Sequence, residues 1–296
     1  MAATSENFGD LLEPGLRKIF TDVYREKPQM MDMLYNVQSS SESYEKDSSV
    51  GSFGTVPEFT GTVSYDDVYQ GYDKTYTHKE YAKGFKVQRS LFDDDLYNVI
   101  SKRPKGLGTS ARRTRESASA STFNNAFTSE PTDGDGAELC ASDHASNATS
   151  TTQSNEGTTA LSPTAVETAR RLMIAFKDDR DGKIDIMPDL LLVPRDLEET
   201  AFEIISSKGK VDSADNNANF HFGKYKLAVW DYLTDSNNWF LIDQDYMKIY
   251  LQWFDRIPLE FNQDKDFDTY IAKFSCYMRY SFSWSDWRWI YGQLVT

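Results

Sequence analysis

The most informative stretch of this sequence is LGTSARRTRESASASTFNNAF, which spans residues 107–127. From Thr109 onward it predicts a helix, and four small residues recur along one face of that helix: Ala111, Thr114, Ala118 and Ser121. A face of small side chains lets a neighbouring backbone approach closely, whereas a helix that docks on its own core usually carries bulky side chains. We therefore expect this helix to pack closely against a neighbouring segment.

A basic stretch overlaps the start of this helix. Between residues 102 and 115 the chain carries six cations and no acid: Lys102, Arg103, Lys105, Arg112, Arg113 and Arg115. The stretch can be a solvated face, a partner for the acidic C-terminal half of a neighbouring subunit, or a surface that faces confined nucleic acid. A net charge of −14 opposes affinity for nucleic acid, so pairing with protein is the favoured interpretation.

The segment before this helix combines a helical period with residues that break helices. From Leu91 apolar residues recur at helical spacing, and three aspartates lie in the favourable first turn. Pro104 and the glycines at 106 and 108 then predict a break or a restart of the helix. Residues 106–111 also match the G-x-G-x-x-A turn of dinucleotide-binding folds, but that turn must follow a buried strand. Here it follows a helix end, so we interpret it as a helix break.

Residues 55–90 predict a long, polar β-hairpin. Tyr, Val and Thr alternate with charged residues around a turn near Gln70-Gly71. Two polar strands are marginally stable in isolation, so the hairpin must lie on its own domain or reach another chain. Its candidates for contact between subunits are Tyr65, Tyr69, Tyr72, Lys74, Tyr76, Lys79 and Lys86. Upstream, residues 8–37 begin as a short amphipathic helix, and the Ser-rich residues 38–54 predict an extended arm.

The C-terminal half alternates between connecting and structured segments. Residues 128–159 contain a single large aliphatic residue and no aromatic one, so they predict a loop or a connecting strap. Ser162-Pro163 predicts the start of a helix, LLLVP at 190–194 a buried strand, and residues 195–207 another helix. The region 220–296 is rich in β signal and holds all six Trp residues, with strict alternation from Phe274 to Trp284.

Composition excludes several classes of protein. The 296 residues are enough for one large or two modest domains, and 39% hydrophobic with 14% aromatic residues exclude disorder throughout. No apolar run reaches the roughly 18 residues of a membrane span. The N-terminus lacks the features of a secretory signal, and two cysteines are too few for a disulfide framework. We expect a soluble protein from a reducing compartment.

Motifs for chemistry are absent from the sequence. Residues 177–184 resemble part of a calcium loop, but Lys177 and Pro188 occupy the first and twelfth ligand positions. The three histidines fall in three separate segments, and none accompanies a nucleophile motif. We therefore expect no catalytic residue, no cofactor and no metal.

Three parts of the chain resemble the Mu-like major head subunits of tailed bacteriophages. Residues 107–127 are similar to the backbone-helix signature of that family. SPTAVETARRLM at 162–173 and PDLLLVPRDLEETAFEIISS at 188–207 look like its central domain. YDKTYTHKEYAKGFKVQRSLFDDD at 72–95 resembles its extended loop and the return of that loop into the spine helix.

The resemblance implies the Hong-Kong-ninety-seven-type capsid fold, an α+β architecture with four parts. These are an N-terminal arm at 1–54, an extended β-hairpin loop at 55–90, a peripheral domain with a spine helix and a sheet at 91–135 and 255–296, and an axial α/β domain at 136–254. The Trp-rich tail matches no motif of the family. No long helical scaffold segment precedes the arm, so we expect any scaffolding protein to be separate.

The function that follows from the resemblance is structural. The chain would self-assemble, without enzymatic activity, into pentamers and hexamers of an icosahedral head that encloses double-stranded DNA. Its partners would be other copies of itself, a separate scaffolding protein, a portal, and packaged DNA through weak non-specific contact, with no membrane. It would assemble in the bacterial cytoplasm and reside in the virion. The alternative is a soluble enzyme or ligand-binding α/β module with an unrecognised site.

Overall fold

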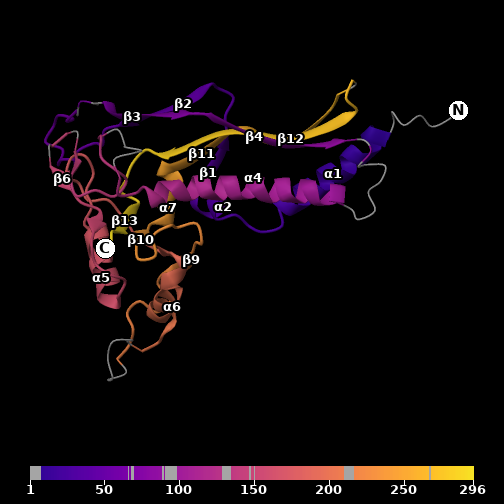
Figure 1. Ribbon diagram of the computed structural model, residues 1–296. Helices are drawn as coiled ribbons and strands as arrows, with labels where there is room; N and C mark the ends of the chain where they lie inside the picture. The colour runs from indigo at the N-terminus through magenta and orange to yellow at the C-terminus, as the bar shows by residue number, and fades with distance from the viewer. Residues whose placement is uncertain are drawn as a thin grey trace.

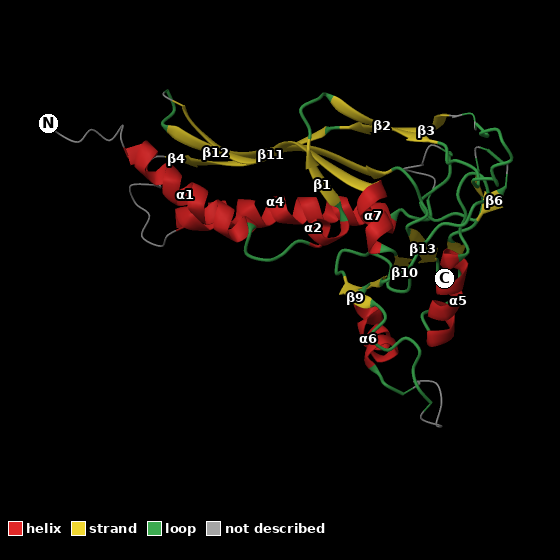
Figure 2. Cartoon of the chain, turned by 180° about the vertical axis from the view of Figure 1, so that it is seen from behind, coloured by secondary structure: helices red, strands yellow, loops and turns green. Residues whose placement is uncertain are grey.

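Two sheets and the helices that pack on them organise the chain in the computed structural model (Figure 1). The structure describes residues 8–65, 67, 70–88, 90, 99–128, 135–146, 148–149, 151–209, 217–266 and 268–296. The first sheet and its helices form an elongated upper unit. The second sheet and its helices lie below one end of that unit, as both views show (Figures 1 and 2). The architecture is α+β, as the sequence predicts.

The first sheet is built around one long hairpin. Its strands, in order across the sheet, are β1 (Asn36–Ser39), β11 (Leu251–Asp266), β12 (Ile271–Trp284) and β4 (Lys79–Gln88). β12 pairs antiparallel with both β11 and β4, and β1 runs parallel to β11. The alternation predicted for residues 274–284 is confirmed as far as Tyr280, because Phe274, Cys276, Met278 and Tyr280 are buried and the residues between them are less so. Beyond Tyr280 it ends, since Ser281 and Ser283 are buried and Phe282 is only partly buried.

Three helices accompany this sheet: α1 (Phe8–Tyr24), α2 (Met30–Leu34) and α4 (Val99–Asn124). α4 runs along the underside of the sheet, with α1 beside its first half (Figure 2). α1 and α4 enclose with the sheet what we call the distal core, made of Leu16, Phe20, Val87, Ile100, Leu107, Ala111, Phe261, Phe274 and Cys276. The helical stretch predicted from Leu91 lies outside the described residues as far as position 98.

α4 is continuous where the sequence predicts a break. Pro104 lies inside it, where proline removes one backbone donor near the helix start, and the packing of Leu107 and Ala111 holds the following turns. Gly108 permits the close approach of α1, because a Cβ there would lie 2.8 Å from the carbonyl oxygen of Phe20. The expected close backbone contact therefore exists, but at Gly108. Of the predicted small face, only Ala111 is fully buried.

The hairpin predicted for 55–90 is wrong in its turn and its partners. β2 (Tyr44–Val50) pairs with β3 (Gln70–Thr77) in a separate two-stranded ribbon, and β4 pairs with β12 of the first sheet. Gln70-Gly71 therefore opens a strand, and residues 51–69 connect the two strands of the ribbon. β4 pairs with a strand far along the chain, and β3 pairs with a strand in the polar arm. Local alternation of polar and apolar residues could not identify either partner.

The second sheet contains five short strands. In order across the sheet they are β7 (Glu156–Gly157), β13 (Ile290–Gln293), β10 (Trp239–Ile242), β8 (Leu190–Val193) and β9 (Lys226–Val229). All four residues of β8 are buried, as predicted for LLLVP. β13 corrects the expected division of the chain: residues 255–296 do not all join the first sheet, because β13 pairs with β10 and β7.

Short helices pack around this second sheet. They are α5 (Pro163–Ile174), the 3-10 turn η1 (Arg195–Leu197) and α6 (Glu198–Ser206). A fourth helix, α7 (Gln244–Tyr250), follows β10 and contacts β11 and α2 of the first unit. α5 begins as predicted, since the side chain of Ser162 accepts a hydrogen bond from the Ala165 amide and proline follows it. The predicted connecting strap contains strands β5 (His144–Ala145) and β6 (Thr152–Gln153), which pair with each other, besides β7.

A large core joins the two sheets, and we call it the junction core. Phe123 near the end of α4 packs edge-on against Trp230, Phe240 and Trp289, with ring centroids 5.8, 5.7 and 6.1 Å away. Trp253 of β11 stacks on Tyr280 of β12 in the same core. All six Trp residues are buried there. The Trp-rich C-terminal region, which matches no motif of the family, therefore supplies aromatic side chains that pack between the two units.

Candidate assembly interface

The β2–β3 ribbon lies over the opposite face of the first sheet from the helices (Figures 1 and 2). Most of its side chains are exposed, and Lys46 pairs with Asp73 at 2.6 Å. Hydrogen bonding to Lys46 lowers the pKa of Asp73 to about 2. Mixed charges of this kind set the register of the two strands, while most of the ribbon surface remains available to other chains.

His78 anchors the ribbon where β3 passes into β4. Its ring is buried, with Nε2 3.1 Å from Ser40 Oγ and Nδ1 2.9 Å from Ser281 Oγ. Ser40 Oγ donates to Glu45, so His78 donates to Ser40 and accepts from Ser281. Burial lowers the pKa of His78, with a further contribution from Arg279. The base of the ribbon is thus tied to both β12 and the segment after β1.

The connection beyond the ribbon exposes a run of large apolar side chains. They are Val50, Phe53, Val56, Phe59, Val63 and Tyr65, which are 57–95% exposed. Residues 51–59 have no hydrogen-bonded secondary structure of their own. A run of large exposed apolar side chains is a candidate interaction surface. We call residues 50–65 the apolar connection, and it is the strongest candidate for a contact with another chain.

The residues predicted from the sequence as contact candidates divide into two groups. Tyr65, Lys79 and Lys86 are exposed, and Tyr65 belongs to the apolar connection. Tyr72, Lys74 and Tyr76 have partners within the chain. Tyr72 donates a hydrogen bond to the Ala145 carbonyl at 3.4 Å, and the Lys74 ammonium lies 5.2 Å from the ring of Trp284.

Tyr76 is the clearest correction among these candidates. It is 2% exposed and packs edge-on against Phe254, with ring centroids 5.0 Å apart. Its position on β3 turns it toward the first sheet, so it holds the ribbon in place. Tyr69 lies outside the described residues. The apolar residues at 50–63 were missed because the sequence interpretation followed Tyr and charge alternation; their number in an otherwise polar segment was the available signal.

The basic stretch is mostly an exposed face of α4. Lys102, Arg103, Lys105 and Arg113 are exposed, and Arg112 is half-buried. Arg115 is buried instead, where its guanidinium bonds to Asp255 at 3.1 Å and lies 5.1 Å from the ring of Trp253. Arg115 therefore belongs to the core and is not part of the predicted basic surface. α1, which packs beside α4, adds Arg17 and Lys18 as further exposed cations.

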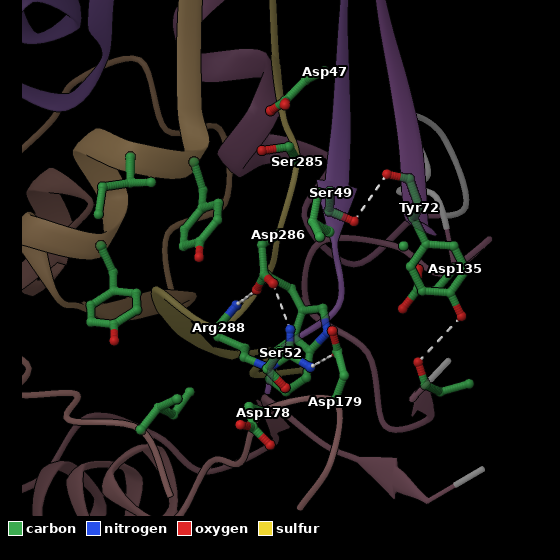
Figure 3. A pocket seen from close by; sticks show the side chains of 18 residues that line it. Asp47, Ser49, Ser52, Tyr72, Asp135, Asp178, Asp179, Ser285, Asp286 and Arg288 are labelled. Atoms are coloured by element: carbon green, nitrogen blue, oxygen red, sulfur yellow. Dashed lines mark hydrogen bonds and ion pairs between the residues drawn. The ribbon is translucent and has the colours of Figure 1, made fainter. Parts of the chain in front are cut away.

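A cavity of about 480 Å³ separates the ribbon from the second unit (Figure 3). Five aspartates line it: Asp47, Asp135, Asp178, Asp179 and Asp286. Asp179 and Asp286 both pair with Arg288, and Asp178 Oδ1 accepts from the backbone amides of Arg180 and Gly182. Most of these carboxylates are thus committed to internal bonds. No group of His, Cys, Asp and Glu among the described residues is arranged to hold a metal ion.

The buried His144 also lacks the surroundings of a catalytic base. Its Nδ1 lies 2.8 Å from Asp135 and its Nε2 3.1 Å from the side-chain oxygen of Asn155. The ring stacks on Trp287 with centroids 4.3 Å apart. Both ring nitrogens are therefore occupied by Asp135 and Asn155, and no hydroxyl or thiol of the described residues bonds to them. The arrangement stiffens the strap.

No helix in the described part of the chain is long and apolar enough to cross a membrane.

Comparison with known proteins points in one direction. A family model described as phage capsid protein matches residues 71–292. The fold is similar to the capsid of cyanophage P-SCSP1u, with a TM-score of 0.62, 10% identity, and coverage of 91% of this chain and 89% of that one. It is also similar to the mature capsid of bacteriophage PhiM1, with a TM-score of 0.61, 11% identity, and coverage of 91% and 88%.

A third similar structure is the capsid of bacteriophage JBD30 decorated with minor capsid protein trimers. There the TM-score is 0.57 at 15% identity, with 70% of this chain and 92% of that one covered. A search of curated proteins found no match. At such low identities these structures establish the fold alone, while the family model spans three quarters of the sequence.

Proposed function

Because this chain belongs to the phage capsid protein family, we propose that it builds an icosahedral head from pentamers and hexamers that enclose double-stranded DNA. The family and the fold make its role structural: it is a capsid protein of the virion and not an enzyme. The alternative of an enzyme or ligand-binding module is therefore set aside. Copies of the chain assemble with one another, and the remaining question is which surfaces they use.

The observation that supports contact through the ribbon is the exposure of the apolar connection. A side chain such as Val56, at 95% exposure, gains nothing from folding of the isolated subunit. Burying such groups against another copy recovers roughly 25 cal/mol for each Å² removed from water. The connection also lies at the tip of the ribbon, and its large apolar side chains from Val50 to Val63 stay exposed although Tyr72, Lys74 and Tyr76 hold the ribbon on its own subunit. We infer that it lies across an adjacent subunit of the same capsomer.

The exposed cations of α1 and α4 support a second contact, with packaged DNA. Lys102, Arg103, Lys105 and Arg113 form a local basic face on an acidic protein. Lysine and arginine that neutralise phosphates give weak, sequence-independent binding that falls as salt rises. Pairing of this face with an acidic surface of a neighbouring subunit is the competing role. A separate scaffolding protein and a portal complete the proposed partners, on the family resemblance.

The test of this function is a matched pair of variants within the connection. In one, Phe53, Val56, Phe59 and Val63 are all replaced by Ser. In the control, the polar neighbours Thr55, Thr60, Thr62 and Ser64 are all replaced by Ala. Both are compared with the parent chain by circular dichroism and by electron microscopy, in cells that carry the other head genes.

We expect both variants to fold, because every altered side chain is outside the cores. The control forms shells, whereas the serine variant accumulates as subunits or unstable capsomers. Normal shells from the serine variant would show that the connection is not an assembly contact. A parent chain that never forms capsomers or shells would contradict the proposed function itself.

A further inference from the structure

His78 is the single residue between the ribbon and the first sheet. β3 ends at Thr77 and pairs with β2, whereas β4 begins at Lys79 and pairs with β12. The chain therefore passes from the ribbon to the sheet at this residue. His78 is 6% exposed, and its neighbours Ser40 and Ser281 are buried as well. A group in this position acts on how firmly the ribbon lies on the sheet.

The hydrogen bonds around Ser40 fix which ring nitrogen of His78 carries the proton. Ser40 Oγ donates its one proton to Glu45 at 2.5 Å and accepts from the Glu42 amide at 3.2 Å. It can therefore only accept from His78, so Nε2 is the protonated nitrogen. Nδ1 then carries no proton and accepts from the Ser281 hydroxyl at 2.9 Å. The neutral ring thus has a partner at both nitrogens, one before the ribbon and one on β12.

A second proton on this ring is unfavourable where the ring now lies. It would bind to Nδ1, toward which the Ser281 hydroxyl directs its own hydrogen, so that hydroxyl would have to turn away. The ring is also buried, and burial makes the charged form of an imidazole costly. Burial lowers the pKa of His78 from its ordinary value of 6.5, and the positive charge of Arg279 lowers it further.

Charged groups act on His78 from several strands. Arg279 on β12 and Arg256 on β11 both oppose a positive charge on the ring, whereas Glu45 on β2 favours one. Glu45 already accepts the proton of Ser40. Glu80 on β4 pairs with Arg279 at 3.7 Å and moderates its effect. Two cations against one nearby anion therefore add to the effect of burial, and the neutral ring is the form that fits this place.

We propose that His78 is a pH switch for the ribbon: the neutral ring holds the ribbon on the first sheet, and protonation in mild acid releases it. Above pH 6.5 the ring is neutral whether the ribbon is docked or released. Below that value the released ring takes up a proton that the docked ring resists, so docking weakens by at most about tenfold for each pH unit. The switch belongs to the subunit alone and does not depend on the proposed assembly contacts.

Amide hydrogen exchange of the full chain tests the switch. A two-stranded ribbon is marginally stable by itself, so release appears as lost protection over β2 and β3. The measured rates are corrected for the intrinsic pH dependence of exchange. The protection of these strands in the parent should then fall roughly three- to tenfold between pH 7.5 and pH 5.5.

Two histidine variants form a matched pair. In His78→Gln the side chain can donate to Ser40 and accept from Ser281 at every pH, so its ribbon should keep the same protection at both pH values. The control is His221→Gln, because His221 is also buried but bonds to the Pro163 carbonyl in the second unit. The ribbon of this control should respond to pH as that of the parent does.

Titration of the imidazole rings by NMR is the second measurement. The ring of His78, assigned by comparison of the histidine variants, should titrate below pH 6.5. Arg279→Gln removes one of the facing cations, so it should raise this pKa and reduce the loss of protection in acid. The titration and this variant decide the question even if His78→Gln fails to dock its ribbon. A ring that titrates at or above 6.5, a parent ribbon that does not respond to pH, or equal losses in the parent and His78→Gln would overturn the switch.

Discussion

Glu116 connects three parts of the molecule through one carboxylate. It accepts hydrogen bonds from the Met30 amide at 2.8 Å and from Trp230 Nε1 at 3.0 Å, so it ties α4 to the N-terminal segment and to the second unit. Burial raises its pKa, and those two bonds offset the effect only in part. A carboxyl group whose pKa is raised by folding stabilises the fold below its ordinary pKa of 4.5. That stabilisation is lost as the pH rises through the raised value.

Replacement of Glu116 by Gln removes this titration and nearly preserves the shape of the side chain. We expect the free energy of unfolding of Glu116→Gln, relative to that of the parent, to increase as the pH is raised from 4 toward neutrality, because only the parent loses stability as Glu116 ionises. Urea unfolding at a series of pH values measures the difference. The substitution also alters the hydrogen bonds of this side chain, but that changes the free energy of unfolding by the same amount at every pH. It therefore does not affect how the difference between the two proteins changes with pH. A difference that stays level across the series would show that burial does not raise the pKa of Glu116.

Gly108 and Gly106 form a natural matched pair for the packing of α1 on α4. A Cβ at position 108 would press on the Phe20 carbonyl oxygen, whereas one at position 106 would meet nothing within 4 Å. Gly108→Ala should therefore destabilise the protein by about 1–3 kcal/mol through overpacking. Gly106→Ala should stabilise it by up to about 1 kcal/mol through helix propensity. Urea midpoints that move together in the two variants would contradict this account of the close approach.

Among elements, α1 depends on the distal core for its place. Phe20 is 3% exposed, and its ring centroid lies 5.1 Å from that of Phe261 on β11. Phe20→Ala should cost about 3–5 kcal/mol within this small core. We expect amide hydrogen exchange over residues 8–24 to accelerate while the second sheet keeps its protection. Phe202→Ala, at a residue 60% exposed on α6, is the control and should leave exchange unchanged.

Elements with a strong local period were predictable, and those defined by distant partners were not. Strand β8 has four buried residues in a row, α5 has its cap and proline, and β12 alternates between buried and less buried residues from Phe274 to Tyr280. The ribbon is different, because YEKDSSV at 44–50 is polar throughout and has no pattern to reveal that it is a strand. Likewise β13 is four residues long, and its place in the second sheet depends on pairing with β10.

The candidate interface shows the same limit of sequence interpretation. Even where the sequence correctly predicts a helix or a strand, a basic or aromatic residue on it can face inward. Arg115 does so beside Asp255, and Tyr76 does so beside Phe254. In both cases the partner lies on β11, far along the chain, so spacing alone could not identify it. The exposed apolar connection was visible in composition, but only the structure shows that no core of its own subunit covers it.

At the scale of the whole molecule, the junction core makes the two sheets unfold together. It contains all six Trp residues, two of them from β11 and β12 and the rest from the second unit and the turn before β13. We expect native Trp emission at short wavelength and one cooperative red shift during urea unfolding. Emission that shifts in two separated steps would show that the two units unfold independently.

The order of strands has a consequence for synthesis on the ribosome. β11 and β12 are the inner strands of the first sheet, and β13 is an inner strand of the second. Early segments such as β1 and β4 therefore wait for partners that are translated much later. The first sheet cannot close before residue 284 has left the exit tunnel, and the second cannot close before residue 293 has done so. Neighbouring nascent chains on one messenger RNA consequently expose their apolar connections before any of them has a finished surface to receive one. Assembly is thereby confined to subunits whose translation has passed the last strand.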